Sequence, residues 1–464
     1  MSAPVVIVGA GPAGISCASV LANRGQDVVL IDDNRAVGGQ YFRQLPETYQ
    51  AEPNNSLLRD TDRFKPLSEI IHNPRVKFLS STTVWGSPDS KTIAYAGPDG
   101  SGRLQARAIV IATGAQEKVI PFPGWTLPGV ITAGGCLNLA KGHGLVPSGR
   151  IVVCGNGPLV LVVAATLIAA NADVVCVAEA QSDIKLAKLA LHGLMLSPRI
   201  FATAIKYRAK IFASSAFYHS NSIVAAVRGK NSLEAVCLAP LGKDGLPYHK
   251  HAKWMEADTL VTGYGLIPNL DLPRLFGCDI VFDPSLNGYV PFRSEFGQTS
   301  KKGIFAVGET GGIGGVEIAL LEGRIAAYAI MGETPPASTK ANYHRIDRFR
   351  RALNLAYQLN NPLRAATPDT IICRCEELTL QQLREAFENS GSTLNTLKTA
   401  TRLGMGRCQG RYCLDSTASL LGFDPDENPV YPRPRPPLRP LPIELIAGDR
   451  DVGPAQEPDE INLN

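Results

Sequence analysis

The sequence predicts an α/β protein in which one nucleotide-binding domain is inserted into another, followed by a small helical domain and an extended tail. Three observations support this fold class. A strand, a glycine-rich turn, a helix and a second strand follow one another in residues 5–33, and the same order recurs in 149–180. An internal repeat of this kind indicates two units of similar architecture. Beyond both repeats, four of the 10 cysteines gather in 373–413.

The composition is that of an ordinary globular chain. The 464 residues are 45% hydrophobic and 19% charged, with a formal net charge of only +4. At about 150 residues a domain, roughly three domains are expected. The scattered Lys and Arg residues predict no nucleic-acid partner and no anionic membrane surface as a partner.

One apolar run, residues 158–170, is too short to cross a bilayer and predicts a buried helix. No transmembrane segment is therefore expected. We expect the protein in the cytoplasm, and a peripheral association with the inner membrane stays open.

The first repeat carries the glycine pattern of a Rossmann-like βαβ unit. Gly9, Gly11 and Gly14 form G-x-G-x-x-G between an apolar strand and an apolar helix that begins near Pro12 and Ala13. In this motif the first glycine permits a tight turn and the second lets a pyrophosphate approach the backbone. The third lets helix and strand pack closely. The helix N-terminus would face the phosphates.

An acidic residue follows the second strand of this unit, as the motif requires. Asp32 is expected to accept hydrogen bonds from a ribose, and Asp33 is the second candidate. Because both strands, the helix and the acid are in place, an ordinary glycine-rich turn is the weaker interpretation.

Two distant segments indicate which dinucleotide binds. One buried strand ends in Thr113 and Gly114, and another ends in Gly308 and Glu309. The pair resembles the signatures of two-domain flavoprotein reductases similar to thioredoxin reductase. There the second signature usually ends in Gly-Asp, whose acid binds the flavin ribityl chain; Glu309 is longer but has the same charge. The resemblance implies FAD in the first domain.

The same resemblance adds residues beside the flavin. It covers Gly38, Gly39 and Gln40, and it implies that Val84, on a short strand, contacts the adenine. No redox-active cysteine pair follows these residues, although disulfide reductases carry one there. Six other cysteines stand apart in apolar surroundings, which predicts buried, inert thiols: Cys17, Cys136, Cys154, Cys176, Cys237 and Cys278. No catalytic residue can be named.

The second repeat is an imperfect copy of the first. Gly155 and Gly157 begin the pattern, but Val160 stands in the place of the third glycine, and Glu179 ends the second strand. A β-branched side chain there is expected to push helix and strand apart or to alter the turn. The unit is then either a retained scaffold or a site for NAD or ATP, and the sequence leaves both open.

The four late cysteines form two close pairs. Cys373 and Cys375 give C-x-C, and Cys408 and Cys413 give C-x4-C. A capping-box helix from Thr379, a second helix and a glycine-rich loop separate the pairs, so that folding this helical hairpin brings four sulfurs together. Four thiolates suit a [2Fe–2S] cluster or a structural Zn²⁺. The tight C-x-C spacing favours the cluster.

This cysteine domain resembles the bacterioferritin-associated-ferredoxin-like (BFD-like) [2Fe–2S] domain of amine and imino-acid dehydrogenases built from several subunits. The members are opine oxidases, D-hydroxyproline dehydrogenase, archaeal-type L-proline dehydrogenase, hydrogen cyanide synthase and heterotetrameric sarcosine oxidase. The resemblance covers nearly the whole chain, including residues 121–135 and the second glycine-rich turn. It identifies the chain as similar to the α (A) subunit of these enzymes.

The resemblance implies an electron-relay function. A flavin-containing β subunit would oxidise a secondary amine or imino acid, such as nopaline, octopine, hydroxyproline or proline. Electrons would pass through FAD and the [2Fe–2S] cluster to a quinone or carrier protein. The family also implies an FMN where the subunits meet and a small third subunit.

Two other functions stay open. A stand-alone NAD(P)H-dependent FAD reductase that feeds the cluster is favoured by the inserted second unit and disfavoured by Val160. A non-catalytic redox-sensing or assembly role is disfavoured by the intact flavin signatures.

These signals also divide the chain into parts. The tail is rich in proline, which predicts an extended arm that lies along its own complex. We expect an FAD-binding domain at 1–120 and 265–335, an inserted nucleotide-binding-like domain at 121–264, a linker helix at 336–365, a BFD-like [2Fe–2S] domain at 366–423, and a Pro-rich extended tail at 424–464.

Overall fold

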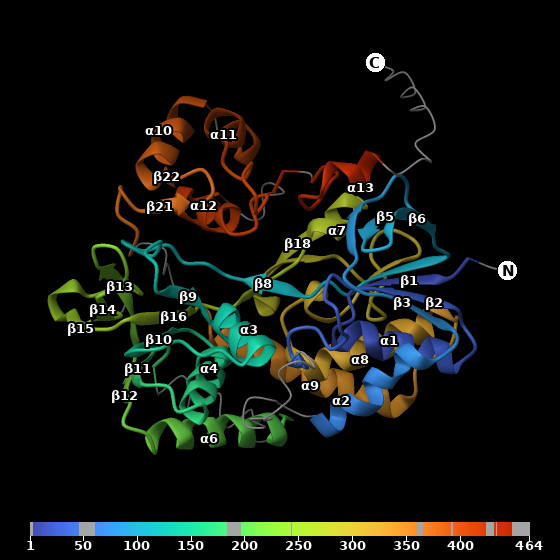
Figure 1. Ribbon diagram of the computed structural model, residues 1–464, viewed down its shortest axis with the longest axis horizontal. Helices are drawn as coiled ribbons and strands as arrows, with labels where there is room; N and C mark the ends of the chain where they lie inside the picture. Colours follow the sequence, from blue (N-terminus) through green and yellow to red (C-terminus); the bar gives the residue numbers. More distant parts are fainter. Residues whose placement is uncertain are drawn as a thin grey trace.

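The computed structural model shows two α/β units side by side, with a smaller helical domain above them (Figure 1). It describes residues 3–45, 61–182, 196–242, 244–359, 365–390, 393–423, 431–432 and 434–447. The two sheets and the C-terminal helices confirm the predicted fold class.

The first unit is built on a five-stranded parallel sheet. Its strand order is β20-β7-β1-β2-β3. The three central strands are buried along their whole length, which is the reason their sequences are continuous apolar runs. The strands are β1 (Val5–Val8), β2 (Val28–Ile31), β3 (Val76–Leu79), β7 (Ala108–Ile111) and β20 (Ile304–Ala306).

Different layers cover the two faces of this sheet. On one face α1 packs against α8. On the other face a three-stranded antiparallel sheet contributes Val84 and Ile93 to a shared core. The elements are α1 (Pro12–Asn23), α2 (Thr61–Ser68), the 3₁₀ turn η2 (Glu69–His72), α8 (Gly315–Ile330), β4 (Thr83–Gly86), β5 (Thr92–Gly97) and β6 (Gly100–Gln105).

The second unit repeats this plan. Its parallel sheet has the order β12-β11-β10-β16-β9. Helices α3, α4 and α6 cover one face, and the antiparallel strands β13-β14-β15 cover the other. The elements are β9 (Val130–Thr132), α3 (Ala133–His143), β10 (Ile151–Gly155), α4 (Pro158–Ala169), β11 (Val174–Glu179), α6 (Pro198–Phe212), β12 (Phe217–Ser220), β13 (Ser222–Arg228), β14 (Ala235–Pro240), η3 (His249–His251), β15 (Lys253–Glu256) and β16 (Thr259–Gly263).

The apolar run at 158–170 forms the buried helix α4, as predicted. The chain returns to the first unit immediately after β16, through β17 (Leu266–Pro268). This strand pairs antiparallel with β8 (Ala115–Glu117). The pair β8–β17 therefore forms the double connection between the two units. The elements that follow are α7 (Asp271–Leu275), β18 (Ile280–Asp283), η4 (Pro284–Leu286), β19 (Gly288–Pro291) and η5 (Gly308–Gly311).

The helix expected at 336–365 is α9 (Ala337–Ala356), and it ends earlier than expected. It is more than a linker, because its Arg350 is buried against α8. Arg350 lies 3.2 Å from a carboxylate oxygen of Glu322, which also bonds Arg293 at 2.8 Å. Such a network stabilises only when every charge in it is paired, as it is here.

The C-terminal helical domain has its own small core, formed by Leu383, Leu397, Leu403 and their neighbours. The predicted capping box is present: the backbone N–H of Thr379 donates to Gln382 Oε1 at 2.9 Å. The elements are β21 (Ile371–Cys373), β22 (Leu378–Thr379), α10 (Leu380–Ser390), α11 (Leu394–Thr401) and α12 (Cys413–Leu421).

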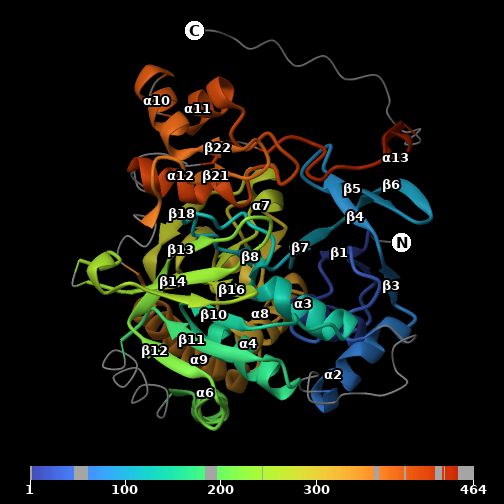
Figure 2. The same ribbon diagram turned by 60° about the vertical axis from the view of Figure 1, so that its left-hand side comes forward.

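The described part of the tail lies along the first unit, between the helical domain and β5–β6 (Figure 2). Leu438 is buried in the core shared with Val84, and its N–H donates to the carbonyl of Trp85 at 2.8 Å. The described part of the tail ends in the short helix α13 (Ile443–Ala447), and residues 448–464 of the predicted arm lie outside the described residues. The predicted arm is thus held by the chain itself. Among the described residues, no helix combines the length and apolar character needed to cross a membrane.

Candidate functional site

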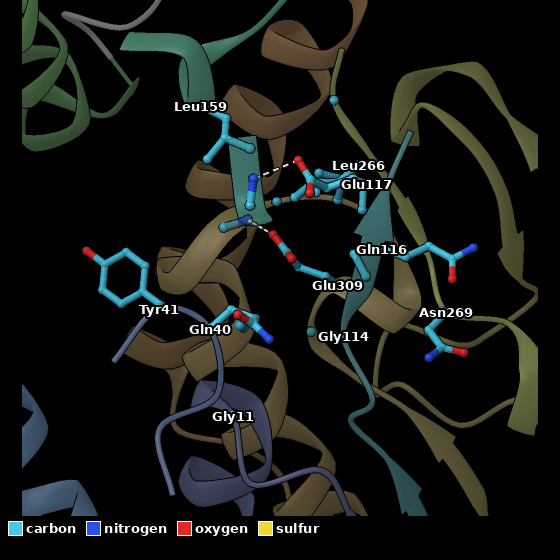
Figure 3. Close-up of a pocket in the computed structure, with 18 of the residues that line it drawn as sticks. Gly11, Gln40, Tyr41, Gly114, Gln116, Glu117, Leu159, Leu266, Asn269 and Glu309 are labelled. Carbon is cyan, nitrogen blue, oxygen red and sulfur yellow. Dashed lines mark hydrogen bonds between the residues drawn. The ribbon is translucent and has the colours of Figure 1, made fainter. Parts of the chain in front are cut away.

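A cavity of about 1500 Å³ opens between the two α/β units and reaches the C-terminal domain. Of the residues predicted to lie at the nucleotide, Gly14 and Gly38 do not line it. The residues that do are Gly9, Gly11, Pro12, Ala13, Asp32, Asp33, Gly39, Gln40, Val84, Thr113, Gly114, Gly308 and Glu309. Figure 3 shows Gly11, Gln40, Gly114 and Glu309 around this cavity.

The three glycines of the first turn have different surroundings. A Cβ on Gly9 would lie 2.3 Å from the carbonyl oxygen of Ala112, and one on Gly14 would lie 1.8 Å from that of Gly9. Gly11 is different, because its nearest neighbour would be Gly39 Cα at 3.9 Å. Gly9 and Gly14 are therefore needed for close packing, whereas Gly11 faces the space that a pyrophosphate would fill.

Asp32 fixes the geometry of this turn. Its Oδ2 accepts from Ala10 N at 2.6 Å, and its Oδ1 accepts from Asn34 N at 2.7 Å. Burial raises the pKa of Asp32, and these hydrogen bonds oppose the shift. Asp33 is exposed, so the structure places Asp32 more deeply in the cavity wall.

The ends of β7 and β20 meet on the other side of the cavity. Gly114 N donates to the Thr310 hydroxyl at 2.9 Å, and Thr310 is completely buried. Glu309 Oε1 accepts from Gly315 N at 3.2 Å, so this carboxylate faces the start of α8. Burial raises the pKa of Glu309. Thr310 could not be identified from the sequence, since only the three-dimensional pairing of the two strand ends reveals its role.

A second carboxylate of the cavity was also missed. Glu117 Oε1 accepts from Gly134 N at 2.7 Å, and Oε2 accepts from Gly135 N at 3.3 Å, at the start of α3. Burial raises its pKa. Figure 3 shows Glu117 near Leu266, beyond Glu309. The only sign of this carboxylate in the sequence was a glutamate in the short strand that follows Gly114.

The second glycine turn differs from the first, as expected from Val160. Gly157 has φ +105°, whereas its counterpart Gly11 has φ −72°. The helix also begins more tightly, because Val160 N donates to Gly157 O at 3.2 Å, three residues back. Val160 itself is completely buried in the helix–sheet core. The turn is altered because a valine, and not a glycine, is packed between helix and sheet at position 160.

The four late cysteines lie together at one end of the C-terminal domain. Cys373 and Cys413 are buried, Cys408 is half-buried and Cys375 is exposed. Interaction with the Cys413 thiol lowers the pKa of Cys373 to about 6 and that of Cys408 to about 5, and the same two neighbours raise the pKa of Cys413. Cys375 and Cys408 also shift each other's pKa, because they are neighbours.

The surrounding loops are shaped for sulfur anions. Backbone N–H groups of Glu376 and Gly404 donate to Cys373. A Cβ on Gly406 would lie 2.3 Å from Cys375 Cβ, so only glycine fits at this position of the loop. Within the described ranges, no three metal-binding side chains converge as they would around a single ion. The donor set is four cysteine sulfurs, which is the set that a [2Fe–2S] cluster takes.

The cysteine domain is fastened to both α/β units. Arg411 Nε and Nη2 donate to Asp271 Oδ2 at 2.9 and 2.5 Å. Gln116, which follows Gly114 by two residues, donates to the Arg411 carbonyl at 2.8 Å. On the second unit, Trp125 Nε1 donates to the Ile371 carbonyl at 2.6 Å. Arg411 also lines the cavity, which therefore extends from the first glycine turn to the Cys408–Cys413 loop.

The six remaining cysteines are all buried, as predicted. Burial raises the pKa of each thiol, to about 12 for Cys17, Cys136, Cys154 and Cys176. They are neither nucleophiles nor ligands in this setting.

Comparison with known proteins agrees with this anatomy. Residues 3–323 match the family model of the pyridine nucleotide-disulphide oxidoreductases, and residues 371–422 match that of the BFD-like [2Fe–2S] binding domain. The A subunit of opine oxidase from Agrobacterium tumefaciens (strain Ach5) is 31% identical, with 96% of this chain and 91% of that protein covered. Hydrogen cyanide synthase subunit HcnB of Pseudomonas protegens is also 31% identical, with 97% and 99% covered.

A solved structure extends the likeness of fold. L-Proline dehydrogenase from P. horikoshii superposes with a TM-score of 0.67 at 19% identity, covering 96% of this chain and 79% of that one. The two family models and the relatives at 31% identity confirm the family predicted from the sequence. The chain belongs to the pyridine nucleotide-disulphide oxidoreductase family, as a member that carries a BFD-like [2Fe–2S] binding domain and is related over nearly its whole length to HcnB and to the A subunit of opine oxidase.

Proposed function

We propose that this chain is the FAD- and [2Fe–2S]-containing electron-transfer subunit of a hetero-oligomeric dehydrogenase that oxidises a secondary amine or imino acid. One observation carries the proposal. A single cavity joins the glycine turn of the first unit to the loop that bears Cys408 and Cys413. Two redox groups held at its ends would exchange electrons within one chain.

The residues of the first unit would hold FAD. The turn at Gly11 would receive the pyrophosphate, and Asp32 would accept from the ribose next to it. Val84 would contact the adenine, and Glu309 the ribityl chain. When bound, the flavin supplies the step between two-electron oxidation of an amine and one-electron chemistry at iron.

The four cysteines would hold the cluster. Cys373, Cys375, Cys408 and Cys413 supply the thiolates, and the backbone N–H groups around them disperse the negative charge. The contact between Gln116 and Arg411 keeps the cluster loop against the flavin side of the cavity.

The substrate would be bound by a partner. Relatives are named as subunits of opine oxidase, hydrogen cyanide synthase and sarcosine oxidase, so partner subunits are expected here as well. We propose a flavin-containing β subunit that oxidises an opine, hydroxyproline or proline, a small third subunit, an FMN at the interface, and a quinone or carrier protein as acceptor.

The division of the chain predicted from the sequence belongs to the same proposal. The FAD-binding domain would consist of 1–120 and 265–335, with 121–264 inserted. The helix within 336–365 joins it to the [2Fe–2S] domain at 366–423, and the tail begins at 424.

Anaerobic purification with native partners tests this function. The complex is expected to oxidise at least one amine of a panel of opines, hydroxyproline, proline, glycine and sarcosine with an artificial acceptor. The chain alone is expected to contain FAD and iron but to show no amine oxidation. Robust amine turnover by the isolated chain would overturn the assignment as a relay subunit.

A further inference from the structure

Glu179, the acid of the second unit, is closed off from the cavity, whereas its counterpart Asp32 in the first unit lines it. Glu179 pairs with Gly155 across β10 and β11, and in the first unit Asp32 and Gly9 directly follow the last pair of β1 and β2, Val8 with Ile31. Asp32 lines the cavity, but Glu179 does not and is 0% exposed. In a dinucleotide site this acid accepts hydrogen bonds from ribose hydroxyls.

In place of a ribose, two tyrosine hydroxyls donate hydrogen bonds to the carboxylate of Glu179. The Tyr218 hydroxyl donates to Oε2 at 2.5 Å, and the Tyr357 hydroxyl donates to Oε1 at 3.2 Å. Arg208 lies 4.0 Å from Oε2 and balances the charge. Burial raises the pKa of both tyrosines, so both remain protonated donors.

Tyr357 belongs to residues 354–359, the segment at the end of α9, which we call the strap. The strap also contacts the turn of the second unit, and residues of both line the cavity. The Asn156 side chain, in the middle of Gly-Asn-Gly, donates to the Tyr357 carbonyl. Gln181, two residues after Glu179, donates to the Gln358 carbonyl at 3.2 Å. Leu359 packs beside Tyr264.

The other side of the strap is fixed to the first unit. Asn354 donates to the carbonyls of Ser285 and Ile313, both at 3.1 Å. Gln358 Nε2 donates to the Pro284 carbonyl at 2.8 Å. The strap therefore holds both nucleotide-binding units.

We propose that the strap closes the second cradle to dinucleotides and turns that unit into a lock between the two α/β units. Glu179, the residue that would bind an adenosine ribose, and Asn156, in the middle of the glycine turn, are both bonded to the strap. The second unit therefore fits neither NAD(P)H nor ATP in the orientation that its fold provides. The inference is independent of the amine dehydrogenase assignment, and it implies that electrons reach the flavin by another route than nicotinamide.

Binding by the holoprotein tests the closure. NADH, NADPH, ATP and ADP-ribose are titrated by calorimetry, and anaerobic flavin absorbance is followed after NADH is added. We expect no saturable binding up to about 1 mM, the weak end of ordinary cofactor affinities, and no bleaching. Saturable binding of any of the four, or rapid bleaching, would overturn the closure.

Hydrogen exchange tests the lock. In Tyr357→Ala, amide exchange at Gly155, Asn156 and Gly157 is expected to rise at least about tenfold over the wild type. The matched control is Tyr248→Ala, which removes an exposed tyrosine between β14 and β15 and should leave those amides unchanged. If Tyr357→Ala does not fold, Tyr357→Phe and Asn156→Ala carry the same comparison. Wild-type exchange in the strap variants would refute the lock.

Discussion

The contact between Arg411 and Asp271 should decide whether the cysteine domain stays docked. The Arg411 side chain is 11% exposed and that of Asp271 is 21% exposed, and two guanidinium nitrogens reach one carboxylate oxygen. Removing one partner of a buried ion pair costs about 3–5 kcal/mol, because the other charge is left uncompensated. Asp271 keeps some contact with water, which reduces the expected cost to about 2 kcal/mol.

A cost of about 2 kcal/mol corresponds to roughly a 30-fold shift of the docking equilibrium towards the open form. Arg411→Ala should therefore slow electron transfer from the reduced flavin to the cluster, measured by anaerobic stopped-flow absorbance. Its iron content should equal that of the wild type, because none of the four cysteines is changed.

The control is Arg384→Ala, which removes an exposed arginine on α10 of the same domain. An Asp271→Asn partner variant completes a double-mutant cycle, and the coupling it measures should be the larger part of the loss. An Arg411→Ala protein with wild-type electron transfer would refute the reasoning that this ion pair docks the cluster domain.

Three other perturbations have distinct expected outcomes. Gly11→Ala should keep its fold and lose most of its FAD, whereas Gly14→Ala should fail to fold, because a Cβ has room at Gly11 and none at Gly14. Flavin content and thermal unfolding distinguish the two variants, and equal stability of the two would contradict this prediction. Cys375→Ser should lose iron and Cys278→Ser should keep it, as an iron assay on anaerobically purified protein shows; full iron in Cys375→Ser would exclude that residue as a ligand. Burial raises the pKa of Glu309 above its ordinary 4.5, so the flavin-free protein should lose stability as the pH rises from 4.5 through the raised pKa. Glu309→Gln should lack this loss. The same pH dependence of urea unfolding in the wild type and in Glu309→Gln would contradict the prediction.

Local and periodic features could be predicted from the sequence. The capping box at Thr379, the glycine spacing of the first turn and the apolar run of α4 each depend on neighbours within a few residues, so the sequence order contains them. The effect of Val160 on the second turn could also be predicted, because a β-branched side chain replaced a residue whose role is packing.

The contacts that define the site could not be predicted in this way. Thr310 meets Gly114 across 196 residues, and Arg411 meets Asp271 across 140. Glu179 follows its strand as a ribose-binding acid would, yet Tyr357, 178 residues later, occupies its carboxylate. Such pairings depend on how the units pack against each other, and one sequence carries no periodic signal for them.

Electron transfer inside the isolated chain tests the central claim most directly. The flavin of anaerobically purified protein is reduced by light, and the sample is frozen for electron paramagnetic resonance. We expect the signal of a reduced [2Fe–2S] cluster to appear as the flavin bleaches. A bleached flavin with no paramagnetic iron would contradict electron transfer between the two groups.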